Sequence, residues 1–440
     1  MEGHLRTIIR QKIVDAQAAP VPAFTRRDVH LPMVPGKAKA VVGMRRSGKT
    51  TLLWQVIADR VASGMPREGL LYFNFEDERL ADLTASDLAL IVEEFYRLHP
   101  QWRDAGTAVF LLDEIQVISG WERFARRLLD TERVEIFLSG SSARMLSREV
   151  ATSMRGRALE VRVFPFSFRE FLRHHGREPE TPPGRLTKAA RSALEKDVRE
   201  FLAGGGFPEA QGLEARDRLE LLRGYVDVVL LRDMIERHGV SQPVALRWLV
   251  RQLLGNAAGA FSVHKFYRDV KSQGFTIAKD TLHAYLGYIE DAFLVTTVFI
   301  ATDSERRRMA NPRKVYPVDP GLIALFDRSG KVNLGHALET SVLSDLLRRG
   351  AEVAYVRTPD GLQVDFLARY PEGGQELIQV CAELDEAATR EREARALIAA
   401  AAAYPKARLS LITLTPETAL GLPKDIAVHS AANWLLTVPP

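Results

Sequence analysis

Residues 43–50 read GMRRSGKT, a match to the pattern G-x-x-x-x-G-K-[ST] at every fixed position. An apolar run, 37–42, precedes the match and a helical pattern, 50–62, follows it, which is the setting that a phosphate-binding loop requires. The two glycines let the backbone wrap so that amide groups converge on phosphate oxygens. We expect Lys49 to reach the β- and γ-phosphates, and the Thr50 hydroxyl to bind Mg²⁺.

Residues 109–114, VFLLDE, carry a second signal. Apolar residues that end in two adjacent acids are typical of a buried strand that delivers carboxylates to a phosphate site. We expect Asp113 to hold Mg²⁺ and Glu114 to polarise an attacking water. By itself the string also fits a buried strand that ends in a solvated acidic turn. Together with residues 43–50 in the same block, it predicts a site for ATP and Mg²⁺.

Around these motifs, strand-like and helix-like segments alternate, which predicts an α/β fold with a parallel sheet covered on both faces. The strand candidates are 37–42, 70–75, 108–112 and 134–138. The pattern from 186 to about 254 is helical. Two helical candidates and a hairpin follow (263–273, 278–289, and 293–300 with 314–316), the order of a winged helix. A second α/β segment begins past Gly335.

We therefore expect five parts along the chain. They are an N-terminal helical extension (1–30), an ATPase core (31–175), a helical lid (185–240), a winged-helix module (241–330) and an α/β domain (331–440).

The composition excludes several classes of protein. Of 440 residues, 46% are hydrophobic and 26% charged, which is ordinary for a chain with sizeable cores and excludes disordered, collagen-like and disulfide-scaffold proteins. Cys381 is the only cysteine, which fits a reducing cytoplasm. No apolar run approaches the roughly 18–20 residues that cross a bilayer. We expect a soluble cytoplasmic protein with no membrane partner.

As a set, the motifs resemble prokaryotic AAA-type ATPases whose phosphate loop reads G-x-R-R-x-G-K-T and whose C-terminal domain of unknown function resembles PD-(D/E)xK nucleases. The resemblance spans nearly the whole chain. It rests on Arg45-Arg46, Ser139-Gly140-Ser141, Gly156-Arg157, residues 167–171 (SFREF) and 205–209 (GGFPE), Lys314-Val315-Tyr316 with Asp319, and Gly335 with Glu339.

The resemblance implies roles for individual residues. Ser139, or its neighbour Ser141, would sense the γ-phosphate, and Arg157 would be an arginine finger for the adjacent subunit of a ring, which we expect to be a hexamer. Asn74 would hold Glu114 off-line until substrate binds. The alternatives are a turn residue for Asn74 and an intrachain ion pair for Arg157. The expected nucleotide contacts are Gly43, Arg45, Arg46, Ser47, Gly48, Lys49, Thr50, Thr51, Asn74 and Asp113.

A basic loop in the predicted hairpin is a candidate for contact with DNA phosphates. Cations there would bind without reading sequence and with strong salt dependence, and residues 1–330 carry the positive charge, +7 against −3 for the remainder. A solvated turn, or a module that binds protein instead, is the alternative. The candidates are Arg306, Arg307, Arg308, Arg313 and Lys314, with Lys265 and Lys279 on the preceding helices.

The C-terminal block resembles a nuclease core that has lost key groups. Glu339 and Asp365 are retained, but Gln379 stands where an acid is expected and Cys381 where lysine belongs. Glutamine brings no negative charge to a metal ion, and a thiol does not replace an ammonium group. We therefore expect no nuclease activity, and a buried thiol rather than a nucleophile at Cys381.

Three functions remain open at this point. The first is a Mg²⁺-dependent ring ATPase that binds and remodels or translocates DNA, including branched or junction DNA. The second is a slow nucleotide-controlled switch or scaffold in defence or regulation. The third, an interaction module with a vestigial site, is disfavoured by the intact Lys49, Thr50, Asp113 and Glu114.

Overall fold

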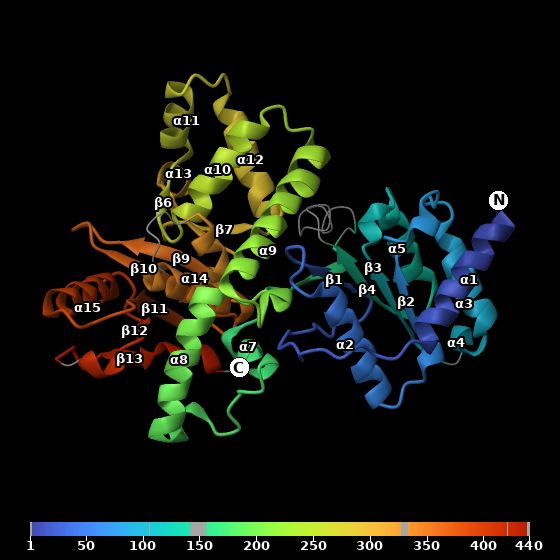
Figure 1. Ribbon diagram of the computed structural model, residues 1–440, viewed down its shortest axis with the longest axis horizontal. Helices are drawn as coiled ribbons and strands as arrows, with labels where there is room; N and C mark the ends of the chain where they lie inside the picture. Colours follow the sequence, from blue (N-terminus) through green and yellow to red (C-terminus); the bar gives the residue numbers. More distant parts are fainter. Residues whose placement is uncertain are drawn as a thin grey trace. The chain divides into compact units, whose positions relative to one another are not determined.

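The computed structural model describes residues 2–104, 106–140, 154, 156–326, 333–419 and 421–437 (Figure 1). The chain divides into two compact units, Met1–Val163 and Phe164–Pro440. Among the residues described, no helix is long and apolar enough to span a membrane.

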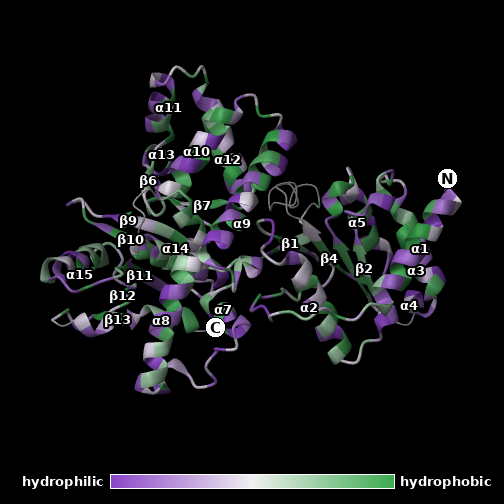
Figure 2. Ribbon diagram, in the orientation of Figure 1, coloured by the Kyte–Doolittle hydropathy of each residue, from purple (hydrophilic) through white to green (hydrophobic). Residues whose placement is uncertain are grey.

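The first unit is built on an all-parallel sheet, as predicted from the alternation of strands and helices. Its strand order is β2-β3-β4-β1-β5. The strands are β1 (Ala38–Val42), β2 (Leu70–Asn74), β3 (Ala108–Asp113), β4 (Val134–Gly140) and β5 (Ala158–Arg162). They are largely hydrophobic along their length (Figure 2), because helices cover both faces of the sheet.

Alternate residues of β3 point to opposite layers of helices. Val109 and Leu111 share a core with α2 (Lys49–Ala62), whereas Phe110 meets Phe95 of α3 (Leu88–Leu98) with ring centroids 5.0 Å apart. The other α-helices among the described residues of this unit are α1 (Glu2–Ala18), α4 (Gln101–Asp104) and α5 (Trp121–Thr131). Residues 43–50 follow β1 and therefore lie at the carboxyl ends of the parallel strands.

The second unit begins with helices and a small antiparallel sheet of order β6-β8-β7. The helices are α7 (Phe168–His174), α8 (Lys188–Gly204), α9 (Ala215–Val228), the π-helical η7 (Val229–Glu236), α10 (Pro243–Gly255), α11 (Val263–Ser272) and α12 (Lys279–Asp291). The strands are β6 (Ala260–Phe261), β7 (Val295–Val298) and β8 (Arg313–Pro317). Helix α7, which we expected within 31–175, lies in this unit.

The connection between β7 and β8 differs from the predicted loop. It contains a short helix, α13 (Glu305–Ala310), which carries Arg306, Arg307 and Arg308. Ser304 caps it, because its Oγ accepts a hydrogen bond from the Arg307 N–H at 3.3 Å.

The last part of the second unit is a mixed sheet of order β13-β12-β11-β10-β9. Strands β9 (Glu352–Arg357), β10 (Gln363–Arg369) and β11 (Gln375–Val380) are antiparallel, and β12 (Arg408–Thr413) and β13 (Ile426–Ser430) continue parallel to β11. Helix α14 (Leu334–Arg348) packs on one face through Val342 and α15 (Ala387–Ala401) on the other through Leu397. The last helix in the described part of the chain is α16 (Ala431–Leu436). Strand β13 was not predicted from the sequence.

Two of the motifs that carry the family resemblance meet in this unit. The buried Asp319 carboxylate accepts hydrogen bonds from the N–H groups of Gly206 at 2.7 Å and Gly321 at 2.9 Å. A Cβ atom on Gly205 would lie 2.0 Å from Asp319 Oδ1, so only glycine fits there. Burial raises the pKa of Asp319 to about 6.

Candidate functional site

The loop 43–50 connects β1 to α2 at the carboxyl edge of the parallel sheet. Its glycines are required by shape, because Gly48 has φ +99° and a Cβ atom on Gly43 would lie 2.2 Å from the Val163 carbonyl oxygen. Lys49 is buried, and its Nζ donates to the carbonyl oxygens of Gly43 at 3.1 Å and Met44 at 3.0 Å. The loop therefore wraps around its own lysine.

Asp113, at the carboxyl end of β3, lies beside the start of α2. Thr50 Oγ1 donates to Asp113 Oδ2 at 2.9 Å, so the two expected Mg²⁺ ligands are in direct contact. Burial raises the pKa of Asp113, and the hydroxyl groups that donate to its carboxylate oppose that rise.

Ser139, near the end of β4, joins the two acids. Its Oγ donates to Asp113 Oδ1 and accepts the Glu114 N–H at 3.3 Å. Glu114 has φ +55°, a left-handed conformation that is rare outside glycine and concentrates at functional sites. Its carboxylate accepts a hydrogen bond from the Gln116 amide.

The residues present fit a nucleotide with Mg²⁺. The hydroxyl and carboxylate oxygens of Thr50 and Asp113 are the hard ligands that Mg²⁺ prefers. Among the described residues, the buried Ser47 Oγ has no hydrogen-bond partner, which leaves a polar group of the loop ready for a ligand.

Comparisons with known proteins agree with this geometry. Residues 35–172 match a family described as an AAA domain, and residues 195–331 match a domain of unknown function. The chain is 32% identical over 375 residues to the uncharacterized protein MJ1544 of Methanocaldococcus jannaschii, covering 84% of this chain and 80% of that protein. The chain is a P-loop AAA-type ATPase of the family that includes MJ1544.

Other similar proteins span most of the ATPase. An uncharacterized protein of Haemophilus influenzae is 30% identical over 332 residues, 75% of this chain and 79% of that one. The Walker-type ATPase PABY2304 of Pyrococcus abyssi is 15% identical with TM-score 0.40, covering 73% of this chain and 95% of the other. The Aeropyrum pernix ORC1 protein, solved in complex with DNA, is 14% identical with TM-score 0.26, covering 73% and 90%. Likeness at these TM-scores adds nothing to the family assignment.

Two groups at the nucleotide site of the ATPase escaped the sequence reading. Tyr72 of β2 donates its hydroxyl to Asp113 Oδ2 at 2.8 Å, and its ring lies 4.8 Å from that of Trp54. The sequence signal that could have identified Tyr72 is its hydroxyl group within the otherwise apolar start of β2, LLYFN. Arg27, from the segment before β1, donates through Nη1 to the Ser47 carbonyl oxygen at 2.8 Å, and no motif marks it.

Asn74 lies opposite Asp113 in the register of β2 and β3, next to the acidic pair. Its Oδ1 accepts the Glu76 N–H at 2.7 Å, as a turn residue does. Burial and then the Glu114 charge raise the pKa of Glu76, whose carboxylate lies 3.9 Å from Arg45. Glu76 is thus a third acid near the loop.

Arg157 lies at the opposite edge of the sheet from the nucleotide loop. Its carbonyl oxygen accepts the Ala38 N–H at 2.9 Å, at the amino end of β1, and its side chain pairs with Asp130. It does not reach the nucleotide site of its own unit. Ser141, the alternative sensor, lies outside the described residues.

The basic candidates range from exposed to buried. Arg306, Arg307, Lys265 and Lys279 are exposed, whereas Arg308 and Arg313 lie over the Phe299 ring, 4.8 and 4.5 Å from its centroid. The prediction that Lys314 contacts DNA is wrong for this structure. It is 4% exposed, because β8 packs it against the C-terminal domain.

The C-terminal candidates Glu339, Asp365 and Gln379 come together around that lysine. Lys314 Nζ lies 2.5 Å from Glu339 Oε1 and 2.9 Å from Asp365 Oδ1. Gln379 accepts the Asp365 N–H at 3.3 Å and donates to Glu393 Oε2 at 2.6 Å.

Cys381 lies near this cluster, with its Sγ 3.1 Å from the Glu383 carbonyl oxygen. Burial, followed by the charge of Glu393, raises the pKa of the Cys381 thiol to about 11. The thiol is therefore protonated at neutral pH, which does not favour a nucleophile.

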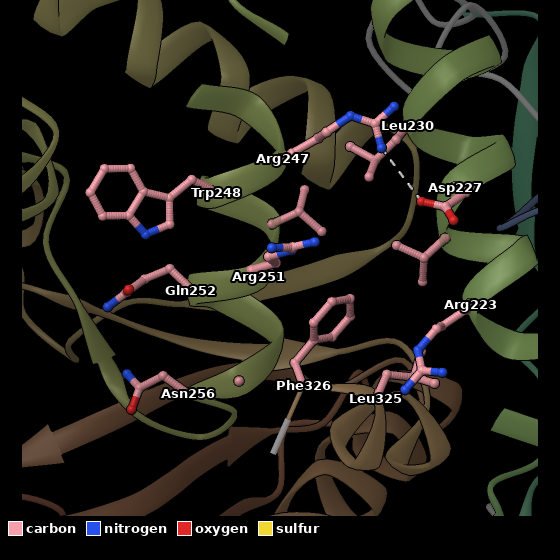
Figure 3. A pocket seen from close by; sticks show the side chains of 13 residues that line it. Arg223, Asp227, Leu230, Arg247, Trp248, Arg251, Gln252, Asn256, Leu325 and Phe326 are labelled. Atoms are coloured by element: carbon pink, nitrogen blue, oxygen red, sulfur yellow. Dashed lines mark ion pairs between the residues drawn. The ribbon is translucent and has the colours of Figure 1, made fainter. Parts of the chain in front are cut away.

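A separate cavity of about 960 Å³ lies in the second unit (Figure 3). Arg223 and Asp227 of α9 face Arg247 and Arg251 of α10 across it, and Arg247 lies 3.6 Å from Asp227. The side chains that line it include none of the residues predicted from sequence.

Proposed function

We propose that this ATPase hydrolyses ATP with Mg²⁺ and works as an oligomeric ring, a hexamer, that binds and remodels or translocates DNA. The observation that carries the proposal is the contact of Thr50 with Asp113 beside the wrapped Lys49. Lys49 binds the β- and γ-phosphates, and Thr50 and Asp113 hold Mg²⁺. The metal ion supplies charge neutralisation on the phosphates.

Glu114 and Ser139 divide the remaining work. Glu114 accepts the proton of the attacking water, once its carboxylate leaves Gln116. Ser139 hydrogen-bonds both the Asp113 carboxylate and the Glu114 N–H. A movement of Ser139 in response to the γ-phosphate would therefore shift both acids.

The position of Arg157 supports the proposed oligomer. Because it lies at the edge opposite its own phosphate loop, it serves as a finger only for a neighbouring subunit. There it neutralises charge on the transferring phosphoryl group.

The second unit supports contact with DNA. The order α10–β6–α11–α12–β7–α13–β8 supports a winged helix with a short helix inserted in its hairpin. Exposed cations on α11, α12 and α13 suit phosphate contacts that carry no sequence information.

One observation favours the slower alternative, a nucleotide-controlled switch. The hydrogen bond from Gln116 occupies the Glu114 carboxylate, and it must break before that group takes a proton. A switch would turn over slowly and respond little to DNA.

The test is phosphate release by the purified chain with ATP and Mg²⁺, alone and with single-stranded, duplex or four-way DNA. We expect Mg²⁺-dependent turnover that DNA stimulates strongly. Little stimulation would favour the switch, and no affinity for ATP with Mg²⁺ would overturn the proposal.

DNA contact is tested separately by its salt dependence. Arg306→Ala and Arg307→Ala should each lower the slope of log affinity against log salt by about 1. Arg216→Ala, an exposed cation on α9, is the matched control and should leave the slope unchanged. DNA binding with the wild-type slope in both α13 variants would remove α13 from the interface.

A further inference from the structure

A lysine stands between two buried carboxylates in the second unit. Lys314 comes from β8, Glu339 from α14 and Asp365 from β10, so three separate elements meet at one ammonium group. Their side chains are only 5%, 11% and 9% exposed. Burial alone would lower the pKa of Lys314, but the charges of Asp365 and Glu339 raise it above its ordinary value.

The charges at this point do not balance. One ammonium group faces two carboxylates, and burial together with the Asp365 charge raises the pKa of Glu339. Among the described residues the other donors to these carboxylates are neutral, namely the Tyr316 hydroxyl to Glu339 Oε1 at 2.7 Å and the Val380 N–H to Asp365 Oδ2 at 3.0 Å. Two buried carboxylates with so little compensation form a position suited to a doubly charged cation.

Lys314 fills that position instead of assisting chemistry there. A lysine that positions water for phosphodiester cleavage must leave the carboxylates free for metal and open to DNA. Here Nζ lies within hydrogen-bond distance of both carboxylates, and all three side chains are buried. The carboxylates are therefore accessible neither to a metal ion nor to DNA.

We propose that Lys314 is a permanent internal cation that takes the place of a divalent metal ion between Glu339 and Asp365. It fastens β8 to the C-terminal sheet, and removing its charge turns the two carboxylates into a site for Mn²⁺ or Mg²⁺. The inference goes beyond ATP hydrolysis and holds whether or not the nucleotide site turns over.

The test compares three full-length chains without nucleotide: wild type, Lys314→Met, and Lys314→Met with Glu339→Gln and Asp365→Asn. Thermal unfolding and calorimetric titration are measured with MnCl₂ and with MgCl₂. All three chains keep the same phosphate loop, so any metal bound there is common to them. We expect Lys314→Met to unfold at lower temperature and to recover several degrees with Mn²⁺, because a ligand of the native state stabilises it. Wild type and the triple variant should show only the metal response that is common to all three chains.

The other outcomes also decide the matter. If Lys314→Met folds only when produced with Mn²⁺, the proposal stands. It falls if Lys314→Met gains no response while the triple variant is folded, or if the wild type shows the same Mn²⁺ response as Lys314→Met. Metal-dependent DNA cleavage by the wild type that Lys314→Met abolishes would make Lys314 a catalytic lysine and overturn the proposal.

Discussion

Each unit of the molecule holds an acid pair near a lysine, and the lysine's partners separate the two sites. In the first unit Lys49 donates to the carbonyl oxygens of its own loop, and the side-chain donors to Asp113 in the described part of the chain are hydroxyl groups. In the second unit Lys314 pairs directly with Glu339 and Asp365. Because its hydrogen-bond donors are neutral, Asp113 keeps the negative charge that attracts a metal ion. In the second site the Lys314 ammonium group neutralises part of that charge and occupies the position between the carboxylates.

Replacing each of the two lysines in turn should give the largest effects and tests this comparison directly. Lys49→Ala should abolish detectable ATP binding or turnover while leaving most of the stability, because its bonds are to neutral carbonyl oxygens. Lys314→Met should leave turnover intact but cost about 3–5 kcal/mol of unfolding free energy, since it strands buried carboxylates. Phosphate release and urea unfolding measure the two effects. Loss of turnover in Lys314→Met with normal stability would contradict the separation.

The proposed arginine finger, Arg157, would act at the nucleotide site of a neighbouring subunit. Arg157→Ala should lower turnover by about 10³–10⁵-fold if it is a finger in trans. Mixing Arg157→Ala with Lys49→Ala subunits should restore part of the activity, measured as phosphate release.

The control for that experiment is its ion-pair partner. Asp130→Ala removes the pair but keeps the arginine, and it should retain activity. Equal losses in Asp130→Ala and Arg157→Ala would make the pair structural, and no recovery in an assembled mixture would count against action in trans.

Glu114→Gln should keep ATP bound but slow its cleavage by about 10²–10⁴-fold, since the amide cannot accept a proton. Nucleotide retention and single-turnover cleavage are the measurements. The matched change in the second unit, Glu339→Gln, should leave both unchanged. Wild-type cleavage in Glu114→Gln would mean that another group, with Glu76 the nearest candidate, takes the proton.

The sequence predicted the first site better than the second for physical reasons. Parallel strands share one carboxyl edge, so residues 50 and 113 had to lie near each other once both motifs were placed on strands. Tyr72 was missed because the direction of a strand residue depends on register. Lys314 was misjudged because it ends a basic run, whereas β8 packs its side chain against Glu339 and Asp365 of the C-terminal domain. The short helix α13 was missed although Ser304 is an N-cap residue.

The smallest expected effects compare two tyrosines that each donate to a carboxylate, Tyr72 to Asp113 and Tyr316 to Glu339. A hydrogen bond to a charged group contributes about 1.5–3 kcal/mol. Tyr72→Phe should therefore weaken Mg²⁺-dependent turnover about tenfold. Asp113 must be ionised to hold the metal, and losing a donor to the ionised form raises its pKa further, so the acid limb of the activity profile should move to higher pH.

Tyr316→Phe should lower stability by a similar free energy and leave that profile in place. A shifted profile in Tyr316→Phe, or an unshifted one in Tyr72→Phe, would show that the two sites do not divide charge and metal between them as the lysine contacts indicate.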